Sequence, residues 1–80
     1  MSISAVRIEP RAVEVSCTSD ALRVRLADGR ELAVPLEWFP RLRKASAEQL
    51  ARYRLIGDGV GINWPELDED ISVEGLLATR

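Results

Sequence analysis

Few residues in this sequence of 80 could carry out chemistry. Histidine, the commonest general base and metal ligand, is absent. The acidic run Asp68-Glu69-Asp70 could bind a divalent cation, but the ligand spacing and closing glutamate of an EF-hand loop are missing. The glycine-rich run from Gly57 to Gly61 lacks the Lys-Ser/Thr pair and the following helix of a phosphate-binding loop. We therefore predict that the protein is not an enzyme and binds no cofactor or metal.

A basic segment and two tryptophans are the remaining candidates, and both point to binding. The basic side chains could form a patch for phosphate groups or an acidic partner, although a solvated basic surface is the simpler explanation. Tryptophan is enriched at protein interfaces. Core packing is the usual role of Trp38 and Trp64 in so small a domain, and Trp38 is the better interface candidate of the two. The candidate partner-binding residues are Trp38, Arg41, Arg43, Arg52 and Arg54, with Lys44 beside them.

The distribution of charge argues against general nucleic-acid binding. Residues 1–54 hold ten Lys/Arg against seven Asp/Glu, a net charge of +3, whereas residues 55–80 hold one against six, a net charge of −5. Proteins that bind nucleic acid without sequence preference normally present a concentrated basic surface. Only a local basic patch would support such a function here.

The composition predicts one cytoplasmic domain spanning residues 1–80. Cys17 is the single cysteine, so no internal disulfide can form, which fits a reducing compartment. Its place within an expected strand, without a basic activator nearby, predicts a buried structural thiol. No apolar run approaches the length of a membrane span, and residues 1–10 lack the apolar core of a signal peptide. We expect no contact with membranes.

Alternating apolar residues predict a three-stranded antiparallel meander in the first half of the chain, with strands at residues 13–17, 22–26 and 31–34. A three-residue loop, Ala27-Asp28-Gly29, would pair aliphatic residues across the second and third strands and place Gly29 in the left-handed conformation that favours glycine. Residues 1–11 could form a leading strand that Pro10 ends.

The second half predicts short helices and a second hairpin. Residues 36–44 are expected to form a helix with Pro40 in its first turn. A second helix at residues 47–53 would begin at a capping box made by Ser46 and Gln49. Strands at residues 54–56 and 60–64 would follow, joined by a turn. In the latter strand, Val60, Ile62 and Trp64 would share one face, and Gly61 would mark a bulge or a close backbone approach.

The last segment contains a well-marked helix start. Pro65 restricts Trp64 to an extended conformation, so a strand should end there. Ser72 is a good N-cap, with Ile71 and Leu76 at the hydrophobic-staple positions, and the run from Asp68 to Asp70 would lie at the positive end of this helix. The expected structural anchors are Gly29, Trp64, Pro65, Ile71, Ser72 and Leu76. Together these elements predict an α+β fold, a small antiparallel sheet packed with two or three short helices.

Three runs carry a resemblance to a known family. They are Val34-Pro35-Leu36-x-Trp38-Phe39-Pro40-Arg41-Leu42, then Ile56-Gly57-x-Gly59-x-Gly61-Ile62, then the segment from Trp64-Pro65 to Gly75-Leu76-Leu77. Over residues 13–77 the chain resembles the bacterial domain of unknown function 2442. One departure is Asn63, where many relatives are expected to carry histidine. The resemblance implies a small α+β domain, with relatives encoded beside another small protein in an arrangement similar to toxin–antitoxin pairs.

Three functions from different classes follow from these observations. The first is a non-catalytic protein-interaction module, the antitoxin-like or regulatory member of a two-gene pair, whose partner is another small protein. The second is a nucleic-acid-associated regulator that uses an arginine-rich face. The third is a small enzyme, which the lack of the usual catalytic groups disfavours. A homodimer formed through an uncovered edge strand is a further possibility.

Overall fold

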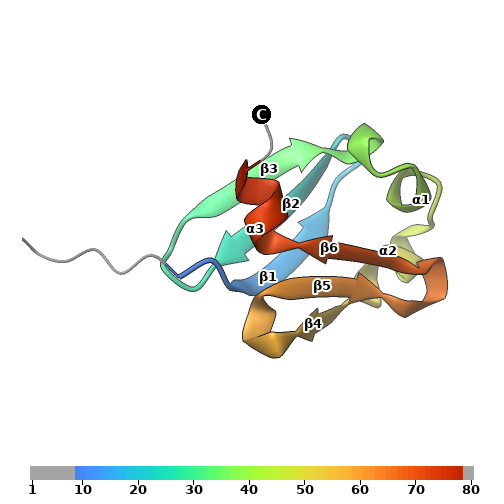
Figure 1. The fold of residues 1–80 in the computed structure, drawn as a ribbon. Coiled ribbons are helices and arrows are strands. Elements are labelled where there is room, and N and C mark those ends of the chain that lie inside the picture. The colour runs from blue at the N-terminus through green and yellow to red at the C-terminus, as the bar shows by residue number, and fades with distance from the viewer. Residues whose placement is uncertain (1–8, 79–80) are drawn as a thin grey trace, which may run out of the picture.

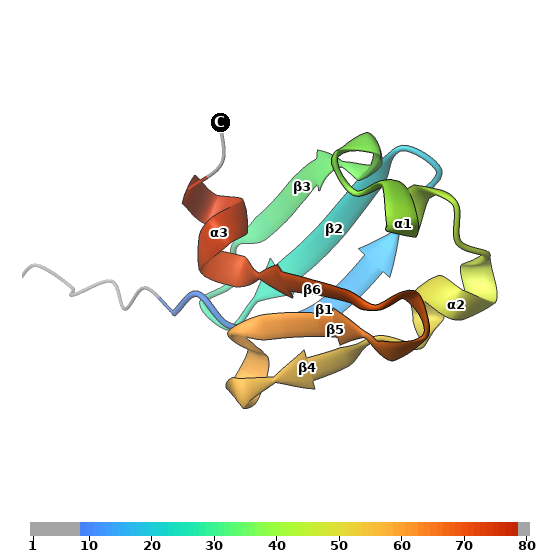
Figure 2. The same cartoon turned by 45° about the vertical axis from the view of Figure 1, so that its right-hand side comes forward.

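The computed structural model describes residues 9–78, which form two three-stranded antiparallel sheets and several short helices (Figures 1 and 2). The predicted α+β fold class is confirmed. In chain order the elements are β1 (Ala12–Cys17), β2 (Ala21–Leu26), β3 (Glu31–Pro35), η1 (Leu36–Trp38), α1 (Pro40–Arg43), α2 (Ala47–Ala51), β4 (Arg54–Ile56), η2 (Gly57–Gly59), β5 (Gly61–Trp64), η3 (Pro65–Leu67), β6 (Glu69–Ser72) and α3 (Val73–Ala78). Of the predicted leading strand, residues 1–8 lie outside the described residues, and residues 9–11 precede β1 without regular structure.

The first sheet has the predicted order β1-β2-β3 and the predicted hairpin register. Leu22 pairs with Val34 and Val24 pairs with Leu32, as the three-residue loop requires. Gly29 adopts a φ of +95°, a conformation that L-amino acids with side chains rarely adopt. The alternation of β2 is also confirmed, because its three aliphatic side chains are buried and its two arginines are exposed.

The alternation predicted for β1 is wrong at its first residue. The pairing with β2 shifts between Ala12 and Glu14, so that Val13 occupies a bulge and is 45% exposed. A bulge moves the side chains on its two sides to the opposite parity. Ala12 and Val15 therefore both face the core, although they lie three residues apart.

The helix predicted for residues 36–44 is interrupted. Phe39 has extended backbone angles (φ −127°, ψ 84°), because the ring of Pro40 disfavours helical geometry in the residue before it. The segment therefore divides into η1 and α1, and Pro40 begins the second piece. The capping box of α2 is confirmed: Ser46 Oγ accepts a hydrogen bond from Gln49 N (3.1 Å), and Gln49 Oε1 accepts one from Ser46 N (3.0 Å). This helix ends at Ala51, two residues earlier than predicted.

The acidic run does not lie at the start of the last helix as predicted, because a strand comes between them. Asp68 has a left-handed backbone conformation, and residues 69–72 form β6, which pairs along β5 and gives the second sheet a third strand. Only Glu74 lies in the first turn of α3. The predicted cap is confirmed, since Ser72 Oγ accepts a hydrogen bond from Gly75 N (3.2 Å). Ile71 and Leu76 are both buried, 6% exposed each.

The close backbone approach predicted at Gly61 occurs at Gly59 instead. Gly61 pairs regularly with Ile56 and Ser72, and an added Cβ there would make only ordinary contacts. At Gly59, which has a φ of +100°, an added Cβ would lie 2.8 Å from the backbone nitrogen of Ala12 and closer still to its carbonyl oxygen. Val60 belongs to the turn before β5 and is 48% exposed, so it does not share the buried face of Ile62 and Trp64.

One hydrophobic core joins the buried faces of both sheets. Trp64 is the largest of its fully buried side chains, with no exposed surface. The helices α1 and α2 lie together at one end of the molecule, while η2 and α3 lie at the other (Figure 2). The buried core residues are Ala12, Val15, Leu22, Val24, Leu26, Leu36, Leu42, Ile62, Trp64, Ile71, Val73 and Leu76.

Candidate interaction surfaces

An open groove of about 480 Å³ lies between the C-terminal half of β1 and the helix α2. Val15, Leu50 and Tyr53 give it an apolar lining, to which two alanines of α2 contribute, and the turn after β1 adds hydroxyl groups. The residues lining this groove, called the β1–α2 groove below, are Val15, Ser16, Cys17, Thr18, Ser19, Ala47, Leu50, Ala51 and Tyr53.

Hydrogen bonds made by the buried Trp64 and the half-buried Tyr53 position both walls of the groove. The indole N–H of Trp64 donates to the backbone oxygen of Leu50 (3.0 Å), which ties α2 to the centre of the core. The hydroxyl of Tyr53 accepts a hydrogen bond from the backbone N–H of Val15 (3.3 Å), which ties the same region to β1. The rings of Tyr53 and Trp64 pack with their centroids 6.4 Å apart. The groove is therefore held open by packed core groups.

The groove runs along the edge of β1 that pairs with no other strand in the described residues. In the described part of the chain, β1 pairs with β2 on one side only. The Val15 N–H points away from β2, because it donates to Tyr53. In an antiparallel ladder, residues two apart direct their backbone groups to the same side, so those of Cys17 face this edge as well. Cys17 itself is half-buried, and burial raises the pKa of its thiol.

The five predicted partner-binding residues come from η1, α1, the end of α2 and the start of β4. Trp38, 42% exposed, lies in η1, and Arg41 and Arg43 lie in α1 directly after it. Arg52 follows α2. Arg54 begins β4 on the second sheet.

Carboxylates neutralise part of this basic set. Arg41 donates to the backbone oxygen of Asp68 and lies 4.0 Å from its carboxylate. Arg52 pairs with Glu66 at 2.7 Å and with Glu48 at 3.4 Å. A nucleic-acid-binding surface needs cations free to meet phosphate groups. Arg41 and Arg52 therefore cannot meet phosphate groups without giving up these contacts.

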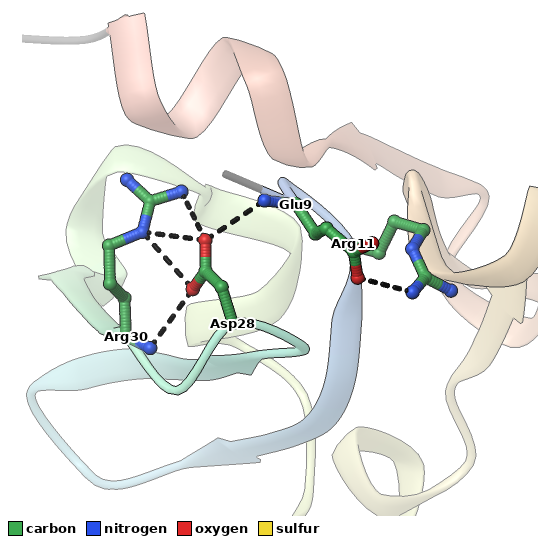
Figure 3. Close-up of polar contacts among 4 residues, drawn as sticks. All are labelled: Glu9, Arg11, Asp28 and Arg30. Atoms are coloured by element: carbon green, nitrogen blue, oxygen red, sulfur yellow. Dashed lines mark hydrogen bonds and ion pairs between the residues drawn. The ribbon is translucent and has the colours of Figure 1, made fainter. Parts of the chain in front are cut away.

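The carboxyl group of Asp28 has a lowered pKa, and its contacts stabilise the fold. Asp28 accepts hydrogen bonds from Arg30 N (3.1 Å), Arg30 Nε (3.0 Å) and Glu9 N (3.0 Å), and its side chain is 7% exposed (Figure 3). The hydrogen bond from the Arg30 side chain, followed by those from backbone N–H groups, lowers the pKa of Asp28 to about 2. Beside it, Arg11 pairs with Glu9 at 2.7 Å. This cluster fastens the start of β1 to the β2–β3 turn.

Residues 9–78 contain no group of three or more cysteine or acidic side chains arranged to hold a metal ion. Within the same range, no helix is long and apolar enough to cross a membrane.

Comparison with known proteins identifies the family. The sequence profile described as "Protein of unknown function (DUF2442)" matches residues 12–80. The chain belongs to the DUF2442 family. The resemblance expected from the three sequence runs is therefore confirmed. No curated protein matches the sequence.

A solved structure supports the fold. The chain is similar to a protein of unknown function from Rhodospirillum rubrum ATCC 11170, whose crystal structure was determined at 2.75 Å resolution. The two are 36% identical, with a TM-score of 0.74, and the match covers 89% of this chain and 88% of the other.

The sequence analysis missed the β1–α2 groove. Its lining comes from two segments about 30 residues apart, and the lining residues are small or apolar, as in any core. One signal was present, because Tyr53 follows a short capped helix and its hydroxyl needs a polar partner once the ring is packed. That partner, the Val15 N–H, could not be identified before the fold was known.

Proposed function

We propose that this DUF2442 protein is a non-catalytic interaction module that binds an extended segment of another small protein in the β1–α2 groove. The observation that carries the proposal is the coincidence of an apolar groove with an edge of β1 that pairs with no other strand among the described residues. Adding a strand to such an edge supplies backbone hydrogen bonds, while pockets for alternate side chains supply specificity.

The lining of the groove indicates the chemistry of the bound segment. A strand beside β1 would direct every second side chain toward Leu50 and the alanines of α2. Apolar side chains of moderate size suit this wall. The hydroxyl groups of Ser16, Thr18 and Ser19 would face the polar part of the same segment.

The neighbouring gene product is the natural candidate for the partner. In the two-gene arrangement that the family resemblance implies, this chain would be the antitoxin-like or regulatory member. We also propose a cytoplasmic location, which suits a single half-buried cysteine. Nucleic-acid regulation is the weaker alternative, because Arg41 and Arg52 already contact carboxylate groups.

The test is a pull-down of the tagged protein from a lysate of its own organism, with and without nuclease, read by mass spectrometry. Ala51 is exposed and lines the groove, so Ala51→Arg should obstruct it without disturbing the core. Ala33→Arg is the matched control, because Ala33 is an exposed alanine on β3, outside the groove.

We expect one stoichiometric protein that survives nuclease treatment, is retained by Ala33→Arg and is lost with Ala51→Arg. Equal capture by both variants would contradict the groove as the binding site. Partners that disappear with nuclease would favour nucleic-acid regulation instead, and the absence of any captured protein would oppose the interaction module.

A further inference from the structure

The exposed face of the second sheet carries opposite charges at its two edges. Strand pairing places Arg54, Asn63 and Asp70 side by side across β4, β5 and β6. Their neighbours in sequence, Ile62 and Ile71, are buried. Because side chains alternate along a strand, this row faces solvent. We call the surface formed by this row and the next one, Ile56, Gly61 and Ser72, the outer face of the second sheet.

The two charges have no ionic partner among residues 9–78. Adjacent strands lie about 4.8 Å apart, so two strand spacings separate the backbones of Arg54 and Asp70, and no ion pair joins their side chains in the described structure. Asn63, between them, donates a hydrogen bond from its side-chain amide to the Asp70 carboxylate, which orients that carboxylate. The row thus runs from a cation at one edge, through an amide, to an anion at the other.

The second row surrounds a hollow. It has a volume of about 560 Å³ and lies around Gly61, bordered by Ile56, Val60 and Ser72 and by the acidic residues Asp70 and Glu74. Ile56 and Val60 beside it are each 48% exposed, which makes them two of the most exposed large apolar residues described. Adjacent exposed apolar side chains on one face often mark an interaction site.

This arrangement is complementary to itself. Consider two copies whose outer faces are opposed and which are related by a two-fold axis that lies between them, parallel to β5. This arrangement would place β4 of each copy over β6 of the other. Arg54 would then face the partner's Asp70, and Asp70 the partner's Arg54. Ile56 would face the partner's Ser72 and fill the space that Gly61 leaves. Two-fold interfaces require this kind of self-complementary surface.

We infer that the outer face of the second sheet is a self-association surface, on which a second copy of this chain packs face to face. The surface is separate from the β1–α2 groove, so the inference does not depend on the proposed function. Charge complementarity identifies the occupant: a foreign partner would need the reverse order of charges, which a second copy of this chain supplies by symmetry.

The test measures molar mass by light scattering and sedimentation over a wide range of protein concentration. We expect the wild-type chain to form dimers. Arg54→Glu and Asp70→Arg should each weaken the dimer about tenfold or more, because each places like charges opposite one another twice. A 1:1 mixture of the two variants should regain dimers, since one variant is then negative at both positions and the other is positive at both.

Two further variants separate association from folding. Arg23→Glu makes the same charge change on the other sheet, where Arg23 is exposed, and should leave the dimer unchanged. Asp70→Asn removes the charge but keeps an oxygen that can accept the Asn63 hydrogen bond, and should weaken the dimer while the far-ultraviolet circular dichroism stays the same. A monomeric wild type at all concentrations, single variants that dimerise normally, or a mixture that stays monomeric would each overturn the inference.

Discussion

Replacing Gly59 with alanine tests the contact that joins the two sheets. Gly59 is buried in η2, its φ is +100°, and its backbone lies against the backbone of Ala12 in β1. An added methyl group would lie 2.8 Å from Ala12 N and closer to Ala12 O, distances that only a movement of β1 or η2 can relieve. Ala12 is 2% exposed, so this movement would disturb the core.

The expected cost has two parts. A left-handed conformation costs an L-amino acid about 1–2 kcal/mol. Forcing an extra carbon into a packed site typically costs a further ~1–3 kcal/mol. Together they remove about 2–5 kcal/mol from a free energy of unfolding expected to be roughly 4–12 kcal/mol for a chain of this length. The variant should unfold at a much lower urea concentration.

Gly29→Ala is the matched control. Gly29 has nearly the same φ, +95°, but an added Cβ there has nothing within 4 Å. The change in unfolded-chain entropy is common to both substitutions. Urea unfolding followed by tryptophan fluorescence should show Gly59→Ala to be less stable than Gly29→Ala by at least ~1 kcal/mol. Equal stabilities would refute the argument from the backbone contact.

Three further predictions concern single interactions. Trp64→Phe removes the hydrogen-bond donor to Leu50 O and leaves a cavity, so it should lower the free energy of unfolding, measured by urea titration, by about 2–4 kcal/mol. Trp38→Phe is the control at an exposed site and should change this free energy by less than ~0.5 kcal/mol. Ser46→Ala breaks the capping box of α2 and should cost about 0.5–2 kcal/mol, measured by thermal unfolding. The pKa of Asp28, about 2 in the folded protein, lies below its value in an unfolded chain, so its ionised form stabilises the fold above about pH 4 and this contribution is lost as the pH falls through about 2. Asp28→Asn should therefore flatten the fall in stability between pH 4 and 2, and an unchanged acid transition would contradict the role given to this carboxylate.

Much of the fold could be predicted where the structure depends on residues that are close together in sequence. The register of the β2–β3 hairpin followed from Gly29 and from the alternation of Leu22, Val24 and Leu26. The capping box at Ser46 and the cap at Ser72 followed from the spacing of short polar residues. Each of these signals lies within a few residues of the structure that it specifies.

The predictions were wrong where contacts between distant parts of the chain determine the local structure. Glu69 and Asp70 are acidic and come shortly before a helix, so local preference predicted that they would lie at its start. Pairing with β5 makes residues 69–72 a strand instead, and only Ile71 in this strand is buried. Gly59 is the glycine whose backbone is closely approached, because β1 passes beside it. No residue near Gly59 in the sequence indicates this contact. The partners of the candidate arginines also depend on distant residues: Arg41 contacts Asp68 and Arg52 contacts Glu66, 27 and 14 residues away in sequence.

The position of β1 has a consequence for how the chain folds. Its contacts with the second half of the chain join residues far apart in sequence, such as Val15 and Tyr53, which are 38 residues apart. Such contacts have a high contact order, and closing the intervening loop costs entropy before they can form. During synthesis, β1 leaves the ribosome well before Tyr53 does. The edge of β1 that faces the groove therefore lacks the Tyr53 hydroxyl and the α2 wall until residues 47–53 have been made.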